Sequence, residues 1–424
     1  MHYKGLMIII DGLGDRRCPH MAGRTPLEAA DTPNLDRLAR EGMTGLVDPL
    51  VPGMPVGTHT GTSVLMGLAP ADAARLARGP VEAAGVGLEL YPGEVFLRCN
   101  FATLSEADED LLIEDRRAGR ILDGTAELAA ELQDVPLGDG ISASLHPATQ
   151  HRAVLRLRGP ELSADITDTD PGSGRRARGV RKSRALDPDD RAAVRTANAV
   201  NLMILEAHRR LRQHPLNEQR RAEGLLPANG LLTRGAGQYS ELRNLVSRLG
   251  IGASVIVGER TVGGLGRLFG FHVVSQPNFS ALPHTDLDGK LAAAMAELES
   301  RDLVFLHIKG PDISSHDRDP MGKKAAIERI DEIIGRLPRG DLVIGITGDH
   351  STDSCSGRHC GDPVPGLITA PHGRRDAVSA FGESCCMNGG LGRVTATSFL
   401  VGMLDAMGAI GNFRPSDRPF LWPG

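Results

Sequence analysis

The chain has 424 residues, of which 41% are hydrophobic and 24% charged, and its formal net charge is -5. This length exceeds one ordinary hydrophobic core and predicts two domains, or one domain with an insertion. The acidic balance argues against attraction of the whole chain to nucleic acid, and an aromatic content of 3% leaves few side chains for base stacking. We therefore expect no nucleic-acid partner.

Cysteine usage and the first apolar run bear on where the protein works. Six cysteines are scattered along the chain without the paired spacing of a zinc knuckle or a dense disulfide framework. Residues 6–10 are far too few to span a membrane, and no secretory cleavage pattern follows them. We expect a cytoplasmic protein with no membrane partner. The sequence leaves the oligomeric state open.

The chain opens with a stretch at residues 6–10 that predicts a strand buried on both faces, since all five positions are apolar. It ends at Asp11, the first candidate metal ligand. A helix is predicted to start at Pro33, because proline fits the first turn of a helix and Thr32 precedes it. A strand followed by a helix is typical of an α/β fold.

Residues 56–65 carry several hydroxyl groups after a segment rich in proline and glycine, and they precede a predicted helix. The hydroxyls belong to Thr58, Thr60, Thr62 and Ser63. Backbone N–H groups at the start of a helix favour a bound phosphate, so one of these hydroxyls is a candidate nucleophile. The alternative is an ordinary hydroxyl-rich helix cap.

From residue 71 to 224 the ligand-bearing strands are absent, and the sequence becomes rich in arginine, alanine, aspartate and turn residues. Within this segment, residues 153–157 predict a strand, and residues 188–213 predict a long helix with Asp187 as its N-cap. The apolar positions of that helix include Val194, Leu202, Leu205 and Leu211. We expect residues 71–224 to form an inserted, smaller α+β domain.

After the insertion the chain returns to alternating strands and helices, so residues 1–70 and 225–424 are predicted to form one core domain. Apolar stretches at 303–308 and 342–346 have the same pattern as the first strand. The predicted fold class is therefore α/β, with a mostly parallel sheet flanked by helices.

Two further helix starts are predicted in the last part of the chain. One follows Asp286, and the other follows Asp319, where Pro320 occupies the first turn. Each precedes apolar residues at helical spacing, as a helix packed on a sheet requires.

Six candidate metal ligands fall in three clusters, each of which directly follows a predicted buried strand. They are Asp11, Asp312, His316, Asp349, His350 and His359. Because the chemistry of an open parallel sheet lies beyond the carboxyl ends of its strands, we expect these side chains to meet at one sheet edge. Mixed carboxylate and imidazole sets bind divalent transition ions. Each residue alone has an ordinary alternative, such as a helix cap, but together they predict a two-metal enzyme.

Two cysteines flank the last of these ligands. Cys355 and Cys360 lie on either side of His359, but phosphate chemistry does not need thiolate ligands. We therefore leave both cysteines out of the predicted ligand set.

Distinctive short motifs are spread along nearly the whole chain. They include Asp11-Gly12-Leu13-Gly14-Asp15, Thr32-Pro33-Asn34-Leu35-Asp36, Arg98-Cys99-Asn100-Phe101-Ala102-Thr103, Thr347-Gly348-Asp349-His350-Ser351 and Gly389-Gly390-Leu391-Gly392-Arg393. In combination they resemble the archaeal-type cofactor-independent phosphoglycerate mutases, which are metalloenzymes of the alkaline phosphatase superfamily. The resemblance implies an alkaline-phosphatase-like fold and interconversion of 3-phosphoglycerate and 2-phosphoglycerate through a phosphorylated side chain.

The resemblance also implies how the ligands divide between two divalent ions. One ion would be held by Asp11, Asp349, His350 and the nucleophile, and the other by Asp312, His316 and His359. Thr58 occupies the nucleophile position. Manganese is the implied ion, with zinc, cobalt and magnesium as alternatives.

The implied substrate is a small phosphorylated carboxylic acid, or a phosphonylated one. The inserted domain would orient it, with Arg78, Arg98, His151, Arg152 and Asp168 at positions similar to substrate contacts in the family. Lys309 would neutralise a phosphoryl oxygen, or else pair with a neighbouring acid.

The nucleophile loop departs from the usual family pattern, in which a serine stands in a Gly-Ser-Asp-Thr-Ala-His-like segment. Here Thr58 stands at the serine position, His59 replaces an acid and Thr62 replaces a histidine. Three alternatives therefore stay open: a specialised paralogue acting on a phosphonate or nucleotide-linked phosphonate in secondary metabolism, a phosphomonoesterase, or a catalytically silent regulator that binds a phosphometabolite.

Residues 175–184 form a basic run with six cations in ten positions. Such a run is typical of a solvated surface loop. The alternative is recognition of a more anionic substrate through bidentate arginine contacts.

Overall fold

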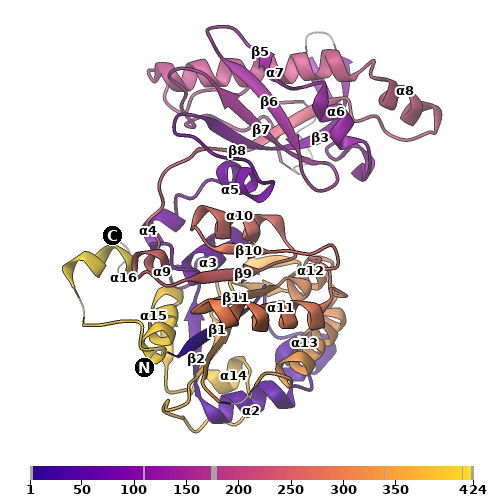
Figure 1. Cartoon of the computed structure of the whole chain (residues 1–424). Coiled ribbons are helices and arrows are strands. Elements are labelled where there is room, and N and C mark those ends of the chain that lie inside the picture. The colour runs from indigo at the N-terminus through magenta and orange to yellow at the C-terminus, as the bar shows by residue number, and fades with distance from the viewer. Residues whose placement is uncertain (1–2, 108–109, 173–178, 339, 413, 422–424) are drawn as a thin grey trace. The chain divides into compact units, whose positions relative to one another are not determined.

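The computed structural model describes residues 3–107, 110–172, 179–338, 340–412 and 414–421. The chain divides into two compact units, shown in Figure 1. Unit 1 comprises Met1–Leu76 and Leu242–Gly424, and unit 2 comprises Ala77–Glu241. Among the described residues, no helix combines the length and the apolar character needed to cross a bilayer.

Unit 1 is built on an eight-stranded sheet in the order β10-β9-β11-β1-β12-β15-β2-β16. Its strands are β1 (Lys4–Ile10), β2 (Met43–Asp48), β9 (Ala253–Ile256), β10 (His272–Val274), β11 (Leu303–Ile308), β12 (Leu342–Thr347), β15 (Val364–Thr369) and β16 (Gly392–Thr395). β1 pairs in parallel with β11 on one side and β12 on the other, whereas β15 runs antiparallel to both of its neighbours. The mostly parallel sheet confirms the predicted α/β class.

Helices cover both faces of this sheet. α2 (Pro33–Glu41), α11 (Leu287–Ser300) and α13 (Pro320–Ile334) share one hydrophobic cluster with alternate residues of β1. On the other face, α15 (Ala396–Ala406) brings Phe399 and Met403 against Gly345 of β12. Burial of both faces is what the continuous apolar strands predicted.

The predicted helix starts in unit 1 are confirmed. Asp286 caps α11 by accepting from Gly289 N at 2.8 Å, and Asp319 caps α13 by accepting from Gly322 N at 2.8 Å. The remaining elements of the unit are η1 (Pro19–Met21), α1 (Pro26–Ala29), α3 (Thr58–Leu65), α4 (Pro70–Ala73), α9 (Leu245–Arg248), α10 (Arg260–Leu268), α12 (Gly310–His316), β13 (Ser351–Asp353), β14 (Arg358–Cys360), α14 (Glu383–Cys386), η3 (Pro415–Asp417) and α16 (Arg418–Leu421).

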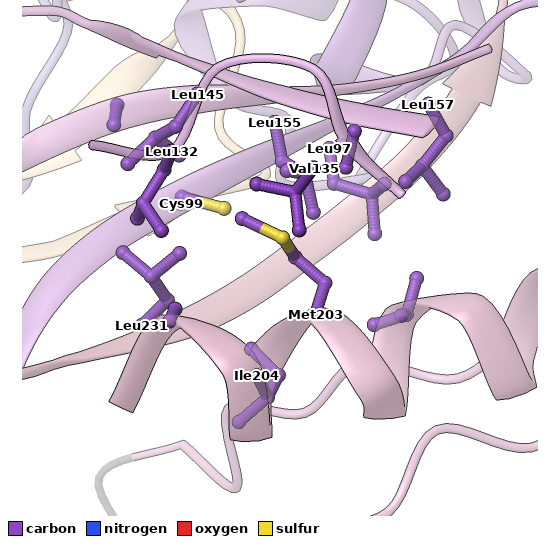
Figure 2. Packing of buried hydrophobic residues seen from close by; sticks show 14 of the residues in the cluster. Leu97, Cys99, Leu132, Val135, Leu145, Leu155, Leu157, Met203, Ile204 and Leu231 are labelled. Carbon is purple, nitrogen blue, oxygen red and sulfur yellow. The ribbon is translucent and has the colours of Figure 1, made fainter. Parts of the chain in front are cut away.

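Unit 2 has a six-stranded antiparallel sheet with its own helices. Its elements are α5 (Arg78–Gly85), β3 (Val95–Ala107), β4 (Asp110–Asp115), η2 (Ala118–Arg120), α6 (Thr125–Ala130), β5 (Val135–Pro136), β6 (Ser142–Pro147), β7 (Arg152–Arg158), α7 (Arg191–Leu211), α8 (Pro215–Ala222) and β8 (Gly230–Gln238). Figure 2 shows Met203 reaching from α7 toward Cys99 and Leu155 of the sheet. Unit 2 therefore has a hydrophobic core of its own.

The structure differs from the sequence-based expectation at the boundaries of the insertion. Unit 2 runs from Ala77 to Glu241, whereas the predicted segment was 71–224. The later end has a physical reason: β8 pairs along β3, so the chain completes the sheet of unit 2 before it returns to unit 1.

The long helix of unit 2 also differs in detail. Asp190, and not Asp187, is the N-cap of α7, because its carboxylate accepts from Ala192 N and Ala193 N. Among the predicted apolar positions Leu211 is buried, but Val194, Leu202 and Leu205 are exposed. The face that packs on the sheet instead consists largely of smaller residues and includes Ala193, Ala197, Val200, Met203, Ile204 and Ala207.

Candidate metal centre

The carboxyl ends of three adjacent parallel strands bring the predicted ligands together. Asp11 follows β1 and its N–H donates to Ile308 O, at the end of β11, at 2.9 Å. Gly12 next to it adopts a φ of 66°, and a Cβ there would lie 2.9 Å from the Cβ of Asp312. Only glycine tolerates this conformation and this closeness together. The two loops can therefore approach.

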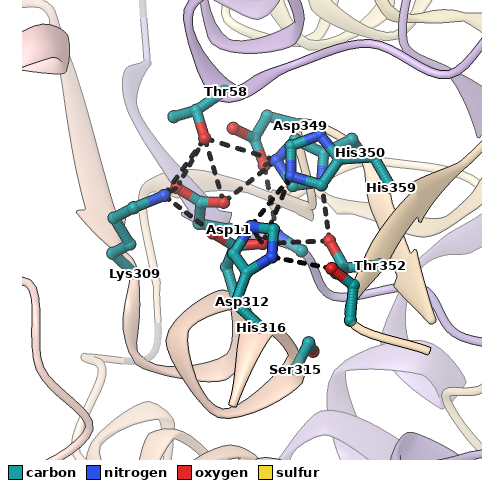
Figure 3. A network of polar contacts seen from close by, with 12 residues as sticks. Asp11, Thr58, Lys309, Asp312, Ser315, His316, Asp349, His350, Thr352 and His359 are labelled. Carbon is teal, nitrogen blue, oxygen red and sulfur yellow. Dashed lines mark hydrogen bonds and ion pairs between the residues drawn. The ribbon is translucent and has the colours of Figure 1, made fainter. Parts of the chain in front are cut away.

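All six predicted ligands gather around this point (Figure 3). Their side-chain ligand atoms form overlapping groups in which all atoms lie within 4.8 Å of one another. The groups are Asp312 with His316 and His359, Asp11 with Asp312 and His350, and Asp11 with His307 and Asp349. Carboxylate and imidazole in such density is a donor set for divalent ions.

The geometry of His316 and His359 fits a shared cation. His316 Nδ1 lies 2.9 Å from Gly357 O, and His359 Nδ1 lies 2.7 Å from Val56 O. A carbonyl can only accept, so each Nδ1 carries the proton and each Nε2 presents a lone pair. The two Nε2 atoms face each other at 3.1 Å, and Asp312 Oδ1 lies 3.4 Å and 3.7 Å from them. Two lone pairs and a carboxylate converging on one point match a metal site.

A hydroxyl orients the buried His350 in the same way. Thr352 Oγ1 donates to Asp312 Oδ1 at 2.9 Å and lies 3.0 Å from His350 Nδ1, which therefore donates to it. His350 Nε2 then points at Asp11 Oδ1, 3.2 Å away. Thr352 was not predicted as part of the site, and nothing in its local sequence marks this role.

Thr58 places its hydroxyl among these groups. Its Oγ1 lies 3.4 Å from both carboxylate oxygens of Asp11, 3.3 Å from His350 Nε2 and 3.1 Å from Lys309 Nζ. Thr58 is the first residue of α3, and no side chain caps the N-terminus of that helix. The positive end of the helix dipole is therefore directed toward the hydroxyl.

Lys309 bridges the carboxylates of the site. Its ammonium lies 2.7 Å from Asp11 Oδ2 and 2.9 Å from Asp312 Oδ2. Burial disfavours its charge, but Asp11 and Asp312 raise the pKa of Lys309 above its usual value. The predicted alternative of pairing with neighbouring acids therefore describes the contacts of Lys309.

Electrostatics in the site favour bound positive charge. Burial opposes the ionisation of Asp11, but Lys309 and the imidazole of His307 hold the pKa of this carboxyl well below its usual range. Burial, and next the charge of Asp11, raise the pKa of Asp349. Burial also disfavours the His350 cation, yet Asp349 and Asp11 raise the pKa of His350 to about 9. Three carboxylates this close together favour positive charge beside them, whether it is an ammonium group, an imidazolium or a metal ion.

His307 belongs to the site although the sequence did not predict it. It is buried, its Nε2 lies 3.2 Å from Asp11 Oδ2, and neither ring nitrogen has a well-aligned hydrogen-bond partner among the described residues. An orphaned buried imidazole beside two carboxylates fits a cation site. The position was missed because His307 lies inside a predicted buried strand and not in the loop after it. His307 is the single polar residue of residues 303–308, and this was the available signal.

The altered residues of the nucleophile loop have defined places. Thr62 is buried and donates to Asp349 Oδ2 at 2.9 Å, so this substitution puts a hydroxyl donor on a predicted ligand. Gly61 lets α3 approach closely, since a Cβ there would lie 1.8 Å from Asp349 O. His59 is half-buried, and its Nε2 lies 3.3 Å from Thr60 Oγ1.

The other predicted substrate residues belong to unit 2, where four arginines lie close together. Burial, and then the nearby Arg78 guanidinium, lower the pKa of Arg98 to about 10, and Arg152 and Arg234 add to this effect. Glu82 is the acid beside them, 3.3 Å from Arg78 Nη2 and 3.9 Å from Arg98 Nε. A second acid, Asp170, lies 3.5 Å from Arg234 Nε but only 2.6 Å from Arg116 Nη2. Two carboxylates among five guanidinium groups leave an excess of positive charge for an anion.

Two further predicted residues lie in unit 2. His151 is buried, and burial followed by the charge of Arg152 lowers the pKa of His151 to about 4. Asp168 accepts from Gly235 N in β8 at 2.8 Å, so it holds backbone in place. Asp168 and Arg234 also line a cavity of about 730 Å³, together with the exposed Arg181, Lys182 and Arg184 of the basic run. Arg175, Arg176 and Arg178 of that run lie outside the described residues.

Comparison with known proteins decides the family. The protein-family model described as 2,3-bisphosphoglycerate-independent phosphoglycerate mutase matches residues 39–217. The protein of that name from Methanopyrus kandleri is 41% identical over 421 residues, which cover 97% of this chain and 98% of the relative. The chain belongs to the family of 2,3-bisphosphoglycerate-independent phosphoglycerate mutases. The predicted family is confirmed, and so is the prediction that the chain is an enzyme.

Other members of the family agree. A 2,3-bisphosphoglycerate-independent phosphoglycerate mutase 1 from Archaeoglobus fulgidus is 40% identical over 414 residues, covering 96% of this chain and 99% of the relative. The solved structure of the cofactor-independent phosphoglycerate mutase from Thermoplasma acidophilum is 32% identical, with a TM-score of 0.69 over 96% of this chain and 100% of that one. These relatives support the mutase interpretation and give no support to the phosphonate, phosphatase or regulator alternatives.

Proposed function

We propose that the chain interconverts 3-phosphoglycerate and 2-phosphoglycerate through a phosphothreonine at Thr58. The observation that carries this proposal is the position of Thr58 Oγ1 between Asp11, His350 and Lys309, at the uncapped start of α3. A nucleophilic hydroxyl needs an acceptor for its proton and positive charge beside the group that it attacks. Asp11 provides the acceptor, and Lys309 and the start of α3 provide the positive charge beside Thr58 Oγ1.

Two divalent ions are part of the proposal, with manganese as the first choice and zinc, cobalt or magnesium as alternatives. One would be held by Asp11, Thr58, Asp349 and His350, and the other by Asp312, His316 and His359. Bound there, the ions would supply Lewis acidity that lowers the pKa of the Thr58 hydroxyl and neutralises charge on a phosphoryl group. The paired Nε2 lone pairs of His316 and His359 and the orphaned His307 support this assignment.

The residues of the chain then define the transfer. The hydroxyl hydrogen of Thr58 points at the Asp11 carboxylate, which leaves lone pairs of Oγ1 for attack on phosphorus. The phosphorus–oxygen bond to the glycerate breaks as the bond to Thr58 forms, the Thr58 proton passes to Asp11, and return of this proton neutralises the glycerate oxygen that leaves. Lys309 Nζ, 3.1 Å from Oγ1, offsets negative charge on the phosphoryl oxygens, and the N–H groups at the start of α3 do the same.

Retention of the glycerate distinguishes a mutase from a phosphatase. In the proposal, Arg78, Arg98 and Arg152 bind its carboxylate, so that the glycerate stays bound between the two phosphoryl transfers. The unbalanced positive charge around Arg98 supports this role, since guanidinium groups bind carboxylates in bidentate fashion. His151 and Asp168 would contact the hydroxyl groups. The proposed partner is thus a small phosphorylated carboxylic acid, and the cytoplasmic location expected from the sequence stays a prediction.

The test of the nucleophile is a pair of variants at one position. Thr58→Ala should bind divalent ions, fail to incorporate phosphate from 3-phosphoglycerate in intact-mass spectrometry, and lose mutase turnover by at least about 10⁴-fold. Thr58→Ser should restore both phosphate incorporation and turnover, because it keeps the hydroxyl. Phosphate found on Thr58→Ala would move the nucleophile to Thr60 or Thr62 and overturn the proposal.

A further inference from the structure

Two cysteines far apart in the sequence meet beside the metal centre of unit 1. Cys18 lies in the loop after β1, and Cys355 lies in the turn between β13 and β14. Their Sγ atoms are 3.5 Å apart, and Cys18 is buried whereas Cys355 is exposed. We propose that Cys18 and Cys355 are a redox modification site, at which a peroxide joins the two loops by a reversible disulfide.

The backbone around both thiols is fixed by a buried ion pair. Lys323 Nζ from α13 lies 2.9 Å from Asp15 Oδ2 and donates to Gly14 O and Thr352 O, each at 3.0 Å. The Asp15 carboxylate also accepts from Ser354 N at 3.1 and 3.3 Å. The residue before Cys355 is thereby tied to the loop that carries Cys18, so the thiols are held face to face. A disulfide needs the sulfurs to close to about 2.05 Å, which is a small step from this distance.

The chemistry needs one oxidant, a peroxide, and balances with it. The exposed Cys355 sulfur attacks a peroxide oxygen, the O–O bond breaks, and a sulfenic acid and one water form. The Cys18 sulfur then attacks the sulfenic sulfur, and the departing hydroxide takes up the thiol proton as a second water. In sum two thiols are oxidised by two electrons and one hydrogen peroxide is reduced to two waters.

Burial, and next the hydrogen bond with Cys18, raise the pKa of Cys355 to about 11. Most of this thiol is therefore protonated at neutral pH, and its S–H is directed at Cys18 Sγ. Because the thiolate is the nucleophile, the first step is slower than at an activated redox cysteine. Oxidation of Cys355 therefore needs sustained exposure to peroxide, whereas the second step is helped by Cys18 Sγ, which already lies 3.5 Å away.

The disulfide would act on the turn that supports two of the predicted ligands. Gly357 O, two residues beyond Cys355, accepts from His316 Nδ1, and β14 carries His359. A bond from this turn to Cys18 closes a loop of more than three hundred residues, because the two positions are separated by 337 in the sequence. Cross-links over long loops restrict the unfolded chain and raise stability. The oxidised form should hold the turn more firmly.

The experiment treats the full chain with hydrogen peroxide and maps its peptides without reduction. The expected product is a cross-linked peptide pair containing Cys18 and Cys355, which dithiothreitol separates. The Tm of the oxidised protein should rise by about 5 °C relative to the reduced protein. A cross-link without a rise in Tm would overturn the stabilising role.

Two variants keep the test specific. Cys355→Ser changes an exposed position and should abolish both the cross-link and the rise in Tm, with a reduced-state Tm like that of the unchanged chain. Cys385→Ser, at another exposed cysteine, should leave both effects in place. Oxidation that leaves Cys18 and Cys355 as free thiols, or that pairs Cys355 with another cysteine, would overturn the proposal.

Discussion

At the scale of single residues, the candidate metal centre depends on which nitrogen of each imidazole carries the proton. His316 and His359 donate from Nδ1 to backbone carbonyls, and His350 donates from Nδ1 to Thr352. In its neutral form each ring therefore directs an Nε2 lone pair into the site, and a metal ion at His350 would replace the proton that Asp349 and Asp11 otherwise favour there. Partners behind the ligands that fix a tautomer in this way raise metal affinity.

Thr352 offers the sharpest test of this arrangement, because it joins His350 to Asp312 through one hydroxyl. Thr352→Ala should weaken divalent-metal binding about 10- to 100-fold, measured by competition with a chelator of known affinity. Thr352→Ser keeps the hydroxyl and should bind nearly as tightly as the unchanged chain. Equal affinity of the alanine variant would mean that His350 is oriented by other contacts.

At the scale of elements, the carboxylate of Glu383 joins the loop after β1 to two short helices. Glu383, the first residue of α14, accepts from Thr25 Oγ1 at 2.7 Å and from Asp15 N at 3.1 Å. Thr25 is in turn the N-cap of α1, in a capping box with Glu28. Burial raises the pKa of Glu383 to about 7, although its hydrogen bond to Thr25 opposes the rise.

This shift predicts a stability that falls with rising pH. The folded-state pKa of Glu383 is about 7, above its ordinary value of 4.5, so between these pH values the folded state holds a proton that the unfolded state has lost. The free energy of unfolding should therefore decrease through this window, by up to about 3 kcal/mol from this group. Urea unfolding at pH 5 and pH 8 measures the decrease.

The control for this prediction is Glu383→Gln, which keeps the shape and cannot ionise. The variant should lose the part of the pH dependence that Glu383 contributes, and so gain stability relative to the unchanged chain between pH 5 and pH 8. If the difference between the two proteins stayed constant across this range, Glu383 would not titrate in it.

At the scale of the whole molecule, the predicted site residues divide between the two units. Unit 1 contains the candidate nucleophile, the ligands and Lys309, whereas Arg78, Arg98, His151, Arg152 and Asp168 are in unit 2. If unit 2 retains the glycerate, a change there should alter binding and leave the metal centre intact.

Arg98→Ala tests this division of labour. Loss of the proposed charge-assisted hydrogen bond to the substrate carboxylate should raise KM for 3-phosphoglycerate about 10- to 100-fold and increase the share of free phosphate released per turnover. Arg98→Lys keeps the charge but not the planar guanidinium group, so its KM should lie between that of the unchanged chain and that of Arg98→Ala. Metal content, measured by mass spectrometry, should match in all three proteins. An unchanged KM would exclude Arg98 from the substrate site.

Local sequence patterns determined the part of this protein that depends on neighbours in the chain. Continuous apolar runs predict strands that are buried on both faces. The polar residues after each run predict which end of the sheet carries the candidate ligands. These signals predicted β1, β11 and β12, the capped starts of α11 and α13, and the six candidate ligands that the structure brings together. The family motifs added the candidate nucleophile Thr58.

Only the tertiary structure decided what depends on pairing between distant segments. The register of β11 beside β1 places His307 against Asp11, and the pairing of β8 with β3 moves the end of unit 2 to Glu241. The packing of α7 on its sheet decides which side of this helix is buried. The loops after β1 and β13 bring Cys18 next to Cys355. Sheet order and loop packing are set by contacts across hundreds of residues, so no local spacing in the sequence encodes them.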